Sequence, residues 1–353
     1  MDSFSDHQSN YSNQSSSESS QELHSSGNWN TPNKSLSVEF QKQSTPFMVS
    51  VLDDMCHEPD FIEPLSEILS NPFTVCKILR EEPSGQIKLT IYFQWLEKSR
   101  KNFVWTVVDN INHFVDNCSG LPDEHLLGFS SLLNFGSFLM ESAWYAEAVI
   151  LLNIAKAQSQ GQPMMMLQVS KFMALALALS NRHEAAFITM SEVHTLLGLI
   201  EGIPKCLKVE THCSLAVSYF ETCEFNASYQ EGLLALQLLE DGICSIETII
   251  GVFRQLSKSC LAKRKPFQAK LLITQAVSWA WHNFGILSRI FADTLEDYAC
   301  YLLMLNAYED AVKVTTDARN IFSFLYGSLA LEPELAQGNL PFRLYLITDE
   351  SWR

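Results

Sequence analysis

Two pairs of charged residues late in the chain have the types and spacing to hold one end of a polypeptide. Arg254 and Lys258 stand four residues apart in "FRQLSKSC", so on a helix they share one face. There they could clamp a terminal carboxylate through charge-assisted hydrogen bonds. Asp293 and Glu296, further along, could hold a basic side chain of the same ligand. The alternative is that Arg254 and Lys258 pair with neighbouring acids within their own helix.

No arrangement of side chains in the sequence indicates catalysis. The Gly-rich phosphate loop, the Gly-x-Ser-x-Gly elbow and the His-Glu-x-x-His zinc motif are all missing from it. The 9 histidines do not cluster, and His183-Glu184 falls between two expected helices, where a solvated cap is the simpler interpretation. We therefore predict that the protein is not an enzyme, with no catalytic residue, no cofactor and no metal site.

Cysteine use and charge restrict the compartment and the partners. The 9 cysteines are odd in number and scattered, which favours buried thiols in a reducing compartment over disulfides or a zinc ribbon. A net charge of −16 disfavours binding to nucleic acid or to an anionic membrane. The sequence begins without a signal peptide, and no apolar run approaches the roughly 20 residues of a membrane span. We predict a cytoplasmic protein and leave the nucleus and the cytoskeleton open.

Four segments differ in composition. Residues 1–34 are rich in Ser, Asn and Gln and predict a disordered tail. Residues 35–123 carry short apolar blocks punctuated by prolines, which indicates a small helical N-terminal region. Within it "IKLTIYF" is β-branched enough to be a strand, although no partner strand is evident. Residues 124–327 are regular, and residues 328–353 form a divergent C-terminal tail.

The regular segment repeats a spacing of small residues. Three small positions, separated by 12 and then 7 residues, recur five times with offsets of 38, 42, 41 and 42 residues, and only Val193 departs from Gly, Ala or Ser. Where two helices cross closely, only small side chains fit. The small residues are Gly136, Ala148 and Ala155; Ala174 and Ala186; Ala216, Ser228 and Ala235; Ser257, Ala269 and Ala276; and Ala299, Ala311 and Ala318.

This periodicity predicts antiparallel helix pairs that stack in series. The turns of the five pairs fall in "SAWYAE", "SNRHEA", "TCEFNA", "KRKPFQ" and "NAYEDA". A single pair cannot bury its apolar face, so neighbouring pairs must pack on one another. The predicted fold is all-α, a tetratricopeptide-like superhelix with a period longer than the usual 34 or so residues. A bundle without repeats is the alternative.

Three blocks of the sequence resemble a known family. "GSFLMESAWYAEA", "VFRQLSKSCLAKRKPFQAKLLITQAV" and "HNFGILSRIFADTLEDYACYLL" are similar to parts of the amyloid protein-binding protein 2 family, over about residues 120–327. That family carries tetratricopeptide repeats resembling those of kinesin light chains. The resemblance implies an adaptor that recruits substrates to a cullin-2 RING ubiquitin ligase through elongin B and C and recognises C-terminal tails of target proteins. Family members are longer and carry further repeats.

The resemblance also implies a short helix that enters an elongin pocket. "SLSVEFQ" offers Leu36 and Phe40 in a setting similar to the family's box, and "SVLDDMC" offers Leu52 and Cys56. Ordinary helix packing explains either pair equally simply. The family is further described as binding the tail of the amyloid precursor protein and as associating with microtubules. An intracellular-transport adaptor linked to microtubules or kinesin therefore remains the second functional hypothesis, and "KRK" at 263–265 is either a solvated turn or a contact for acidic tubulin tails.

Overall fold

The computed structural model describes residues 40, 42–117, 127–240 and 242–327. Within these ranges the regular structure is entirely helical, which confirms the predicted all-α class. The predicted disordered tail at 1–34 and the divergent tail at 328–353 lie outside the described residues. The first helices along the chain are α2 (Thr45–Met55), the 3-10 turn η1 (Pro59–Phe61), α3 (Ile62–Leu69), α4 (Pro72–Glu81), α5 (Gly85–Ser99) and α6 (Phe103–Asn117).

The segment "IKLTIYF" is helical and lies inside α5. Its β-branched residues disfavour a helix locally. However, Leu89, Tyr92, Phe93 and Leu96 follow the helical spacing and are all buried. Packing of this face against the neighbouring helices overrides the local preference, and the strand alternative is wrong.

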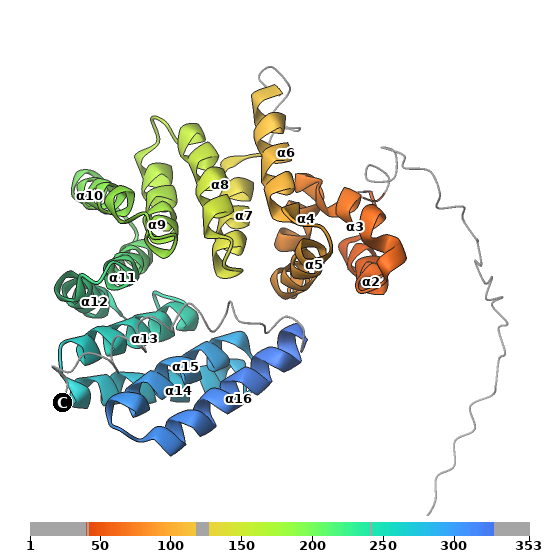
Figure 1. The fold of residues 1–353 in the computed structure, drawn as a ribbon. Helices are drawn as coiled ribbons and strands as arrows, with labels where there is room; N and C mark the ends of the chain where they lie inside the picture. The colour runs from red at the N-terminus through yellow and green to blue at the C-terminus, as the bar shows by residue number, and fades with distance from the viewer. Residues whose placement is uncertain (1–39, 41, 118–126, 241, 328–353) are drawn as a thin grey trace, which may run out of the picture. The chain divides into compact units, whose positions relative to one another are not determined.

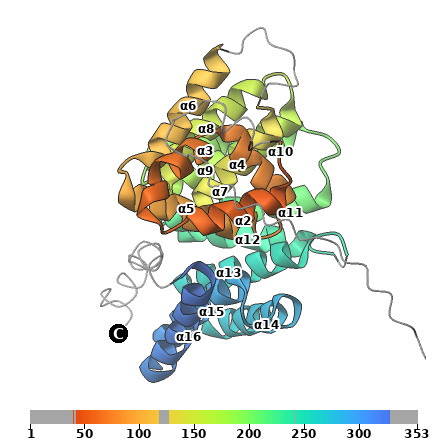
Figure 2. The ribbon, with the colours of Figure 1, turned by 90° about the vertical axis from the view of Figure 1, so that its right-hand side faces the viewer.

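Five helix pairs follow in the described part of the chain, and together they are called the helix-pair array below. Figure 1 shows the pairs in sequence, and in Figure 2 helices α15 and α16 run side by side. The pairs are α7 (Phe129–Glu141) with α8 (Tyr145–Gln158), α9 (Pro163–Leu179) with α10 (His183–Leu199), α11 (Lys205–Glu221) with α12 (Phe225–Leu238), α13 (Ile246–Ala262) with α14 (Pro266–Phe284), and α15 (Arg289–Met304) with α16 (Tyr308–Tyr326).

Every pair is closed by the same three-residue turn. Its middle residue has a positive φ between 56° and 67°, and its last N–H bonds back to a carbonyl five residues earlier at 2.8 to 3.0 Å. This is the Schellman arrangement that satisfies the last carbonyls of a helix. The middle residues, in order, are Ala143, Asn181, Cys223, Arg264 and Asn306.

Glycine in place of Ala143 is expected to stabilise the protein by about 0.5–1 kcal/mol. A side chain in the left-handed region is strained, and glycine relieves that strain. The matched control is Ala146→Gly, the same change inside α8, which should destabilise by a similar amount. Urea unfolding curves of both variants give the comparison. Two changes of the same sign would contradict the role assigned to the turn.

The small residues of the repeat lie at the helix crossings. All fourteen are buried, and so is Val193. In three pairs the first and second small positions are adjacent: a side chain built on Gly136 would lie 3.9 Å from the Ala148 carbonyl oxygen. The Ser257 hydroxyl donates to the Ala269 carbonyl at 3.0 Å, and Ser228 donates to Ala216 at 2.7 Å. At these crossings a side chain of one helix therefore contacts the backbone of the other helix directly.

Gly232 occupies a position that holds a large residue in other pairs. A Cβ built on it would lie 2.9 Å from Leu256 Cδ1, so Leu256 of the next pair fills the space that Gly232 leaves open. The irregularity in the repeat is thus compensated by a neighbour. The buried side chains of α2–α6 and of α7–α11 also form one continuous core, so the N-terminal region packs directly on the array.

Candidate functional site

Stacking of the first helix of each pair brings charged side chains of different repeats together. Helix α9 contacts α11, α11 contacts α13, and α13 contacts α15. Lys171 of α9 binds Glu210 of α11 at 2.7 Å. One such group, called the α13–α15 cluster here, contains Arg254 and Lys258 of α13 with Arg289, Asp293 and Asp297 of α15.

Arg254 is bound by two acids of the following pair. Its Nε donates to Asp297 Oδ2 at 2.6 Å, and its Nη2 donates to the Asp293 carbonyl at 3.1 Å. The Asp293 carboxylate lies 3.8 Å from Nη1. Asp297 is almost completely buried, with 1% of its side chain exposed, so this pair is an internal structural contact.

Lys258 lies beside the same carboxylate. Its Nζ is 3.7 Å from Asp297 Oδ1 and 5.5 Å from the centre of the Phe220 ring. Burial raises the pKa of the Glu221 carboxyl, while Lys258 opposes that rise and Asp297 adds to it. For Arg254, burial alone would lower the pKa, but Asp297 and Asp293 raise it overall. The Arg254 guanidinium therefore stays charged, and the carboxylates of Asp297 and Asp293 balance its charge.

The cluster continues to the first pair and the N-terminal region. Arg289 Nη1 donates to Glu141 Oε2 of α7 at 2.7 Å, and its Nε lies 3.8 Å from Asp293. Gln86 of α5 donates to the same Glu141 carboxylate. Nearby, Ile87 and Ile91 of α5 pack against buried side chains of α15 and α16. The last pair is therefore tied to helices far earlier in the chain.

The structure thus places Arg254, Lys258 and Asp293 of the predicted ligand-binding residues in the α13–α15 cluster. Arg254 and Lys258 do share one face of α13, and Asp293 lies beside Arg254, while Glu296 is half-buried and helps to raise the Arg254 pKa. The acids that pair with the two cations come from the next helix pair, 39 and 43 residues along the chain. A ligand carboxylate at this place would share Arg254 with these acids.

The two candidate elongin boxes differ in accessibility. Leu52 is fully buried and Cys56 is buried, both in the core that α2 shares with α3–α5. A side chain in this position cannot enter another protein's pocket unless α2 leaves the core. Phe40 is half-buried and packs against the same core, and Leu36 lies outside the described residues.

The other singled-out residues have structural neighbours. Lys263 donates to the Asn226 side chain, and Lys265 donates to the Tyr229 hydroxyl at 2.9 Å and lies 4.2 Å from its ring centre. His183 and Glu184 do not lie between helices but begin α10, and His183 Nε2 lies 3.4 Å from Asn181 Oδ1 in the preceding turn. Burial raises the pKa of Cys76 to about 12 and that of Cys213 to about 11. Among the described residues no group of His, Cys, Asp and Glu is placed to hold a metal ion.

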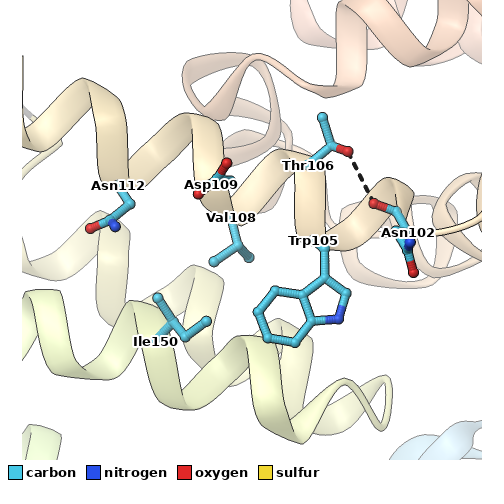
Figure 3. Close-up of a pocket in the computed structure, with 7 residues that line it drawn as sticks. All are labelled: Asn102, Trp105, Thr106, Val108, Asp109, Asn112 and Ile150. Atoms are coloured by element: carbon cyan, nitrogen blue, oxygen red, sulfur yellow. Dashed lines mark hydrogen bonds between the residues drawn. The ribbon is translucent and has the colours of Figure 1, made fainter.

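One site was missed by the sequence interpretation. A cavity of about 300 Å³ lies between α6 and α8, lined mainly by one face of α6 and by Ile150 of α8 (Figure 3). The Trp105 indole forms one wall, and in Figure 3 it lies below the side chain of Val108. A signal was present in "NFVWTVVDNIN", because Trp105 falls on the polar side of an amphipathic helix whose buried residues include Phe103, Val107 and Ile111.

Fold and site define a class of protein: a helical-repeat protein of stacked helix pairs, the kind of array that presents extended surfaces to other polypeptides. No protein-family model matches the chain. It is similar to amyloid protein-binding protein 2 of Rattus norvegicus and of Mus musculus, each 27% identical over 132 residues. The match covers 37% of this chain and 22% of each relative, so the chain spans about a fifth of the length of these curated relatives. The similarity indicates distant relatedness.

A solved structure gives a weaker likeness. BtubC (BKLC) from P. vanneervenii is 12% identical, with a TM-score of 0.42, over 69% of this chain and 93% of that one. A TM-score this low does not define a shared fold. Among the described residues, no helix combines the length and the apolar character needed to cross a bilayer.

Proposed function

We propose that this protein is a non-catalytic adaptor that binds a segment of another polypeptide on its helix-pair array. The observation that carries the proposal is the unbroken series of contacts from α9 through α11 and α13 to α15. Helices stacked in this way expose a long surface made of several repeats, and such surfaces bind extended segments. The distant relatives are named as amyloid protein-binding, which supports the same class of function.

The more specific proposal is a substrate-recruiting subunit of a cullin-2 RING ubiquitin ligase in the cytoplasm. Such a subunit raises the effective concentration of its target near the ligase and performs no chemistry itself. In this proposal the array binds C-terminal tails of targets, and the N-terminal region binds elongin B and C. Phe40 is the better candidate for the elongin contact, because it is half-buried, whereas Leu52 and Cys56 are buried in the protein's own core.

Affinity purification of the tagged full chain from cultured mammalian cells tests the ligase role. Elongin C and cullin-2 are expected in the eluate, and Phe40→Asp should reduce both at least about tenfold, because a charge in an apolar pocket is costly. The matched control is Phe47→Asp on α2, where the phenylalanine is 53% exposed and the same change should leave both partners bound. Quantitative mass spectrometry gives the readout.

Two outcomes would decide against the ligase role. Recovery of kinesin or tubulin without elongin would favour the transport adaptor. Equal loss of elongin in the Phe47→Asp variant would assign the effect of Phe40→Asp to damage of α2 rather than to a lost contact. Circular dichroism of both variants monitors the helices during the comparison.

A further inference from the structure

The cavity between α6 and α8 exposes an aromatic ring beside hydrogen-bond acceptors. Trp105 is 42% exposed, although the residues around it on the buried side of α6 have almost no exposure. Asp109 stands four residues after Trp105, so the two share one face of α6, and Asn102 lies in the turn just before the helix, with a φ of 63°. Figure 3 shows the indole of Trp105 and the side chain of Ile150 both lying between the two helices.

The apolar floor of the cavity has an origin in the repeat. Ile150 follows Ala148 by two positions, and the same position in α10 and α14 holds Ile188 and Leu271, which are 73% and 71% exposed. In the first pair this position is half-buried, because α6 contacts α8 there. Together with buried Val108, Ile150 forms the apolar part of the cavity.

The acceptor side of the cavity is held in place. The Glu97 carboxylate accepts hydrogen bonds from the backbone N–H groups of Asn102 and Val104, at 2.9 and 3.0 Å. The Thr106 hydroxyl donates to the Asn102 carbonyl at 3.0 Å, as drawn in Figure 3. These bonds fix the first turn of α6 and bring a second carboxylate, Glu97, close to the cavity.

The charge of the lining has one sign. Asp109 is the charged residue that lines the cavity, and the other polar side chains there are neutral: Asn102, Thr106 and Asn112. His113, one turn further along, has its Nε2 3.8 Å from Asp109 Oδ2, and both side chains are more than two-thirds exposed. A group that fits must therefore be cationic, able to donate several hydrogen bonds and partly apolar.

We propose that this cavity binds the guanidinium group of an arginine side chain from a partner polypeptide. A guanidinium stacks on an indole face, donates to a carboxylate and to amide oxygens at once, and leaves its methylene stem for an apolar floor. A lysine ammonium lacks the planar group and spreads fewer donors over these acceptors. The net charge of −16 attracts a basic segment toward this surface.

The site is independent of the proposed adaptor surface. It belongs to α6 and α8, whereas the predicted tail-binding residues Arg254 and Lys258 lie on α13. Loss of arginine binding would leave the adaptor proposal standing, and loss of tail binding would leave this site standing.

Titration of the ¹⁵N-labelled full chain with N-acetyl-arginine methylamide, followed by the tryptophan indole signals, tests the proposal. The chain has 7 tryptophans, and Trp105→Phe assigns the signal that matters. That signal is expected to shift saturably in the millimolar range. The neutral isostere N-acetyl-citrulline methylamide should not shift it, and the lysine analogue should bind several-fold more weakly. Trp281, which is 55% exposed on α14, is the internal control and should not respond.

Asp109→Asn is expected to weaken binding of the arginine probe at least about fivefold, because it removes the charged acceptor. Asp317→Asn, an exposed aspartate on α16, is the matched control and should bind as the unaltered chain does. Both changes are at exposed positions, and the unchanged indole spectrum of each variant verifies the fold. Three results would each overturn the proposal: no shift of the Trp105 indole signal with the arginine probe, an equal shift of that signal with the citrulline probe, or an equal shift of the Trp281 indole signal.

Discussion

Replacing Asp297 with alanine is expected to lower the free energy of unfolding by about 3 kcal/mol. The reason is that this carboxylate, with only 1% of its side chain exposed, faces two cations that are themselves largely withdrawn from water. Arg254 would keep the carbonyl and carboxylate of Asp293, but Lys258 would lose the carboxylate it faces. A buried charge without its partner costs far more than the pair contributes in net stability.

The measurement is urea unfolding followed by circular dichroism. Asp317→Ala is the matched control, because it removes the same charge from an exposed helical position and should change stability by less than about 0.5 kcal/mol. A change below about 1 kcal/mol for Asp297→Ala would show that water or other groups replace the carboxylate, and would remove the structural role assigned to it.

The same geometry bears on how tail binding can be tested. An Arg254→Glu variant would put a carboxylate beside Asp293 and the buried Asp297. Repulsion there would destabilise α13 and α15. Loss of peptide binding in such a variant would therefore not distinguish a broken site from a broken fold.

Replacing Ala269 with leucine is expected to destabilise the protein by about 2–3 kcal/mol. Ala269 is fully buried at the crossing of α13 and α14, where the Ser257 hydroxyl donates to its carbonyl at 3.0 Å. Three more carbon atoms at this place must push the helices apart or force strained rotamers. The pair α13–α14 would loosen, and with it the contact between α13 and α15.

Lys270→Leu is the matched control for Ala269→Leu. It introduces the same side chain one residue later, at an exposed position of the same helix, and should change stability by less than about 0.5 kcal/mol. Equal effects of the two changes would contradict the close crossing. Urea unfolding measures the stability, and hydrogen exchange of α13 and α14 shows whether the loosening is local.

The helix pairs were predictable from the sequence because their causes are local or periodic. Each close helix crossing requires a small residue at the same position of the repeat. The turn within each pair is closed by a backbone N–H that donates to a carbonyl only five residues earlier. Both signals survive even where one pair departs from the pattern, as at Gly232, because Leu256 of the next pair fills the space. The spacing of Arg254 and Lys258 on one face of α13 was likewise predictable from helical geometry.

The partners of these residues were decided by how the helices pack. Asp297 meets Arg254 across 43 residues of chain, and Arg289 meets Glu141 across 148. Such contacts depend on the rotation and offset of each helix relative to the next. The repeat pattern in the sequence does not specify either of these. The same holds for α5, where burial of one face overrides β-branched residues, and for the cavity at Trp105, which exists because α6 rests on α8. Local interactions can be predicted from residues that are close in the sequence. The partner of a charged side chain on one helix, in contrast, depends on which helix packs beside it.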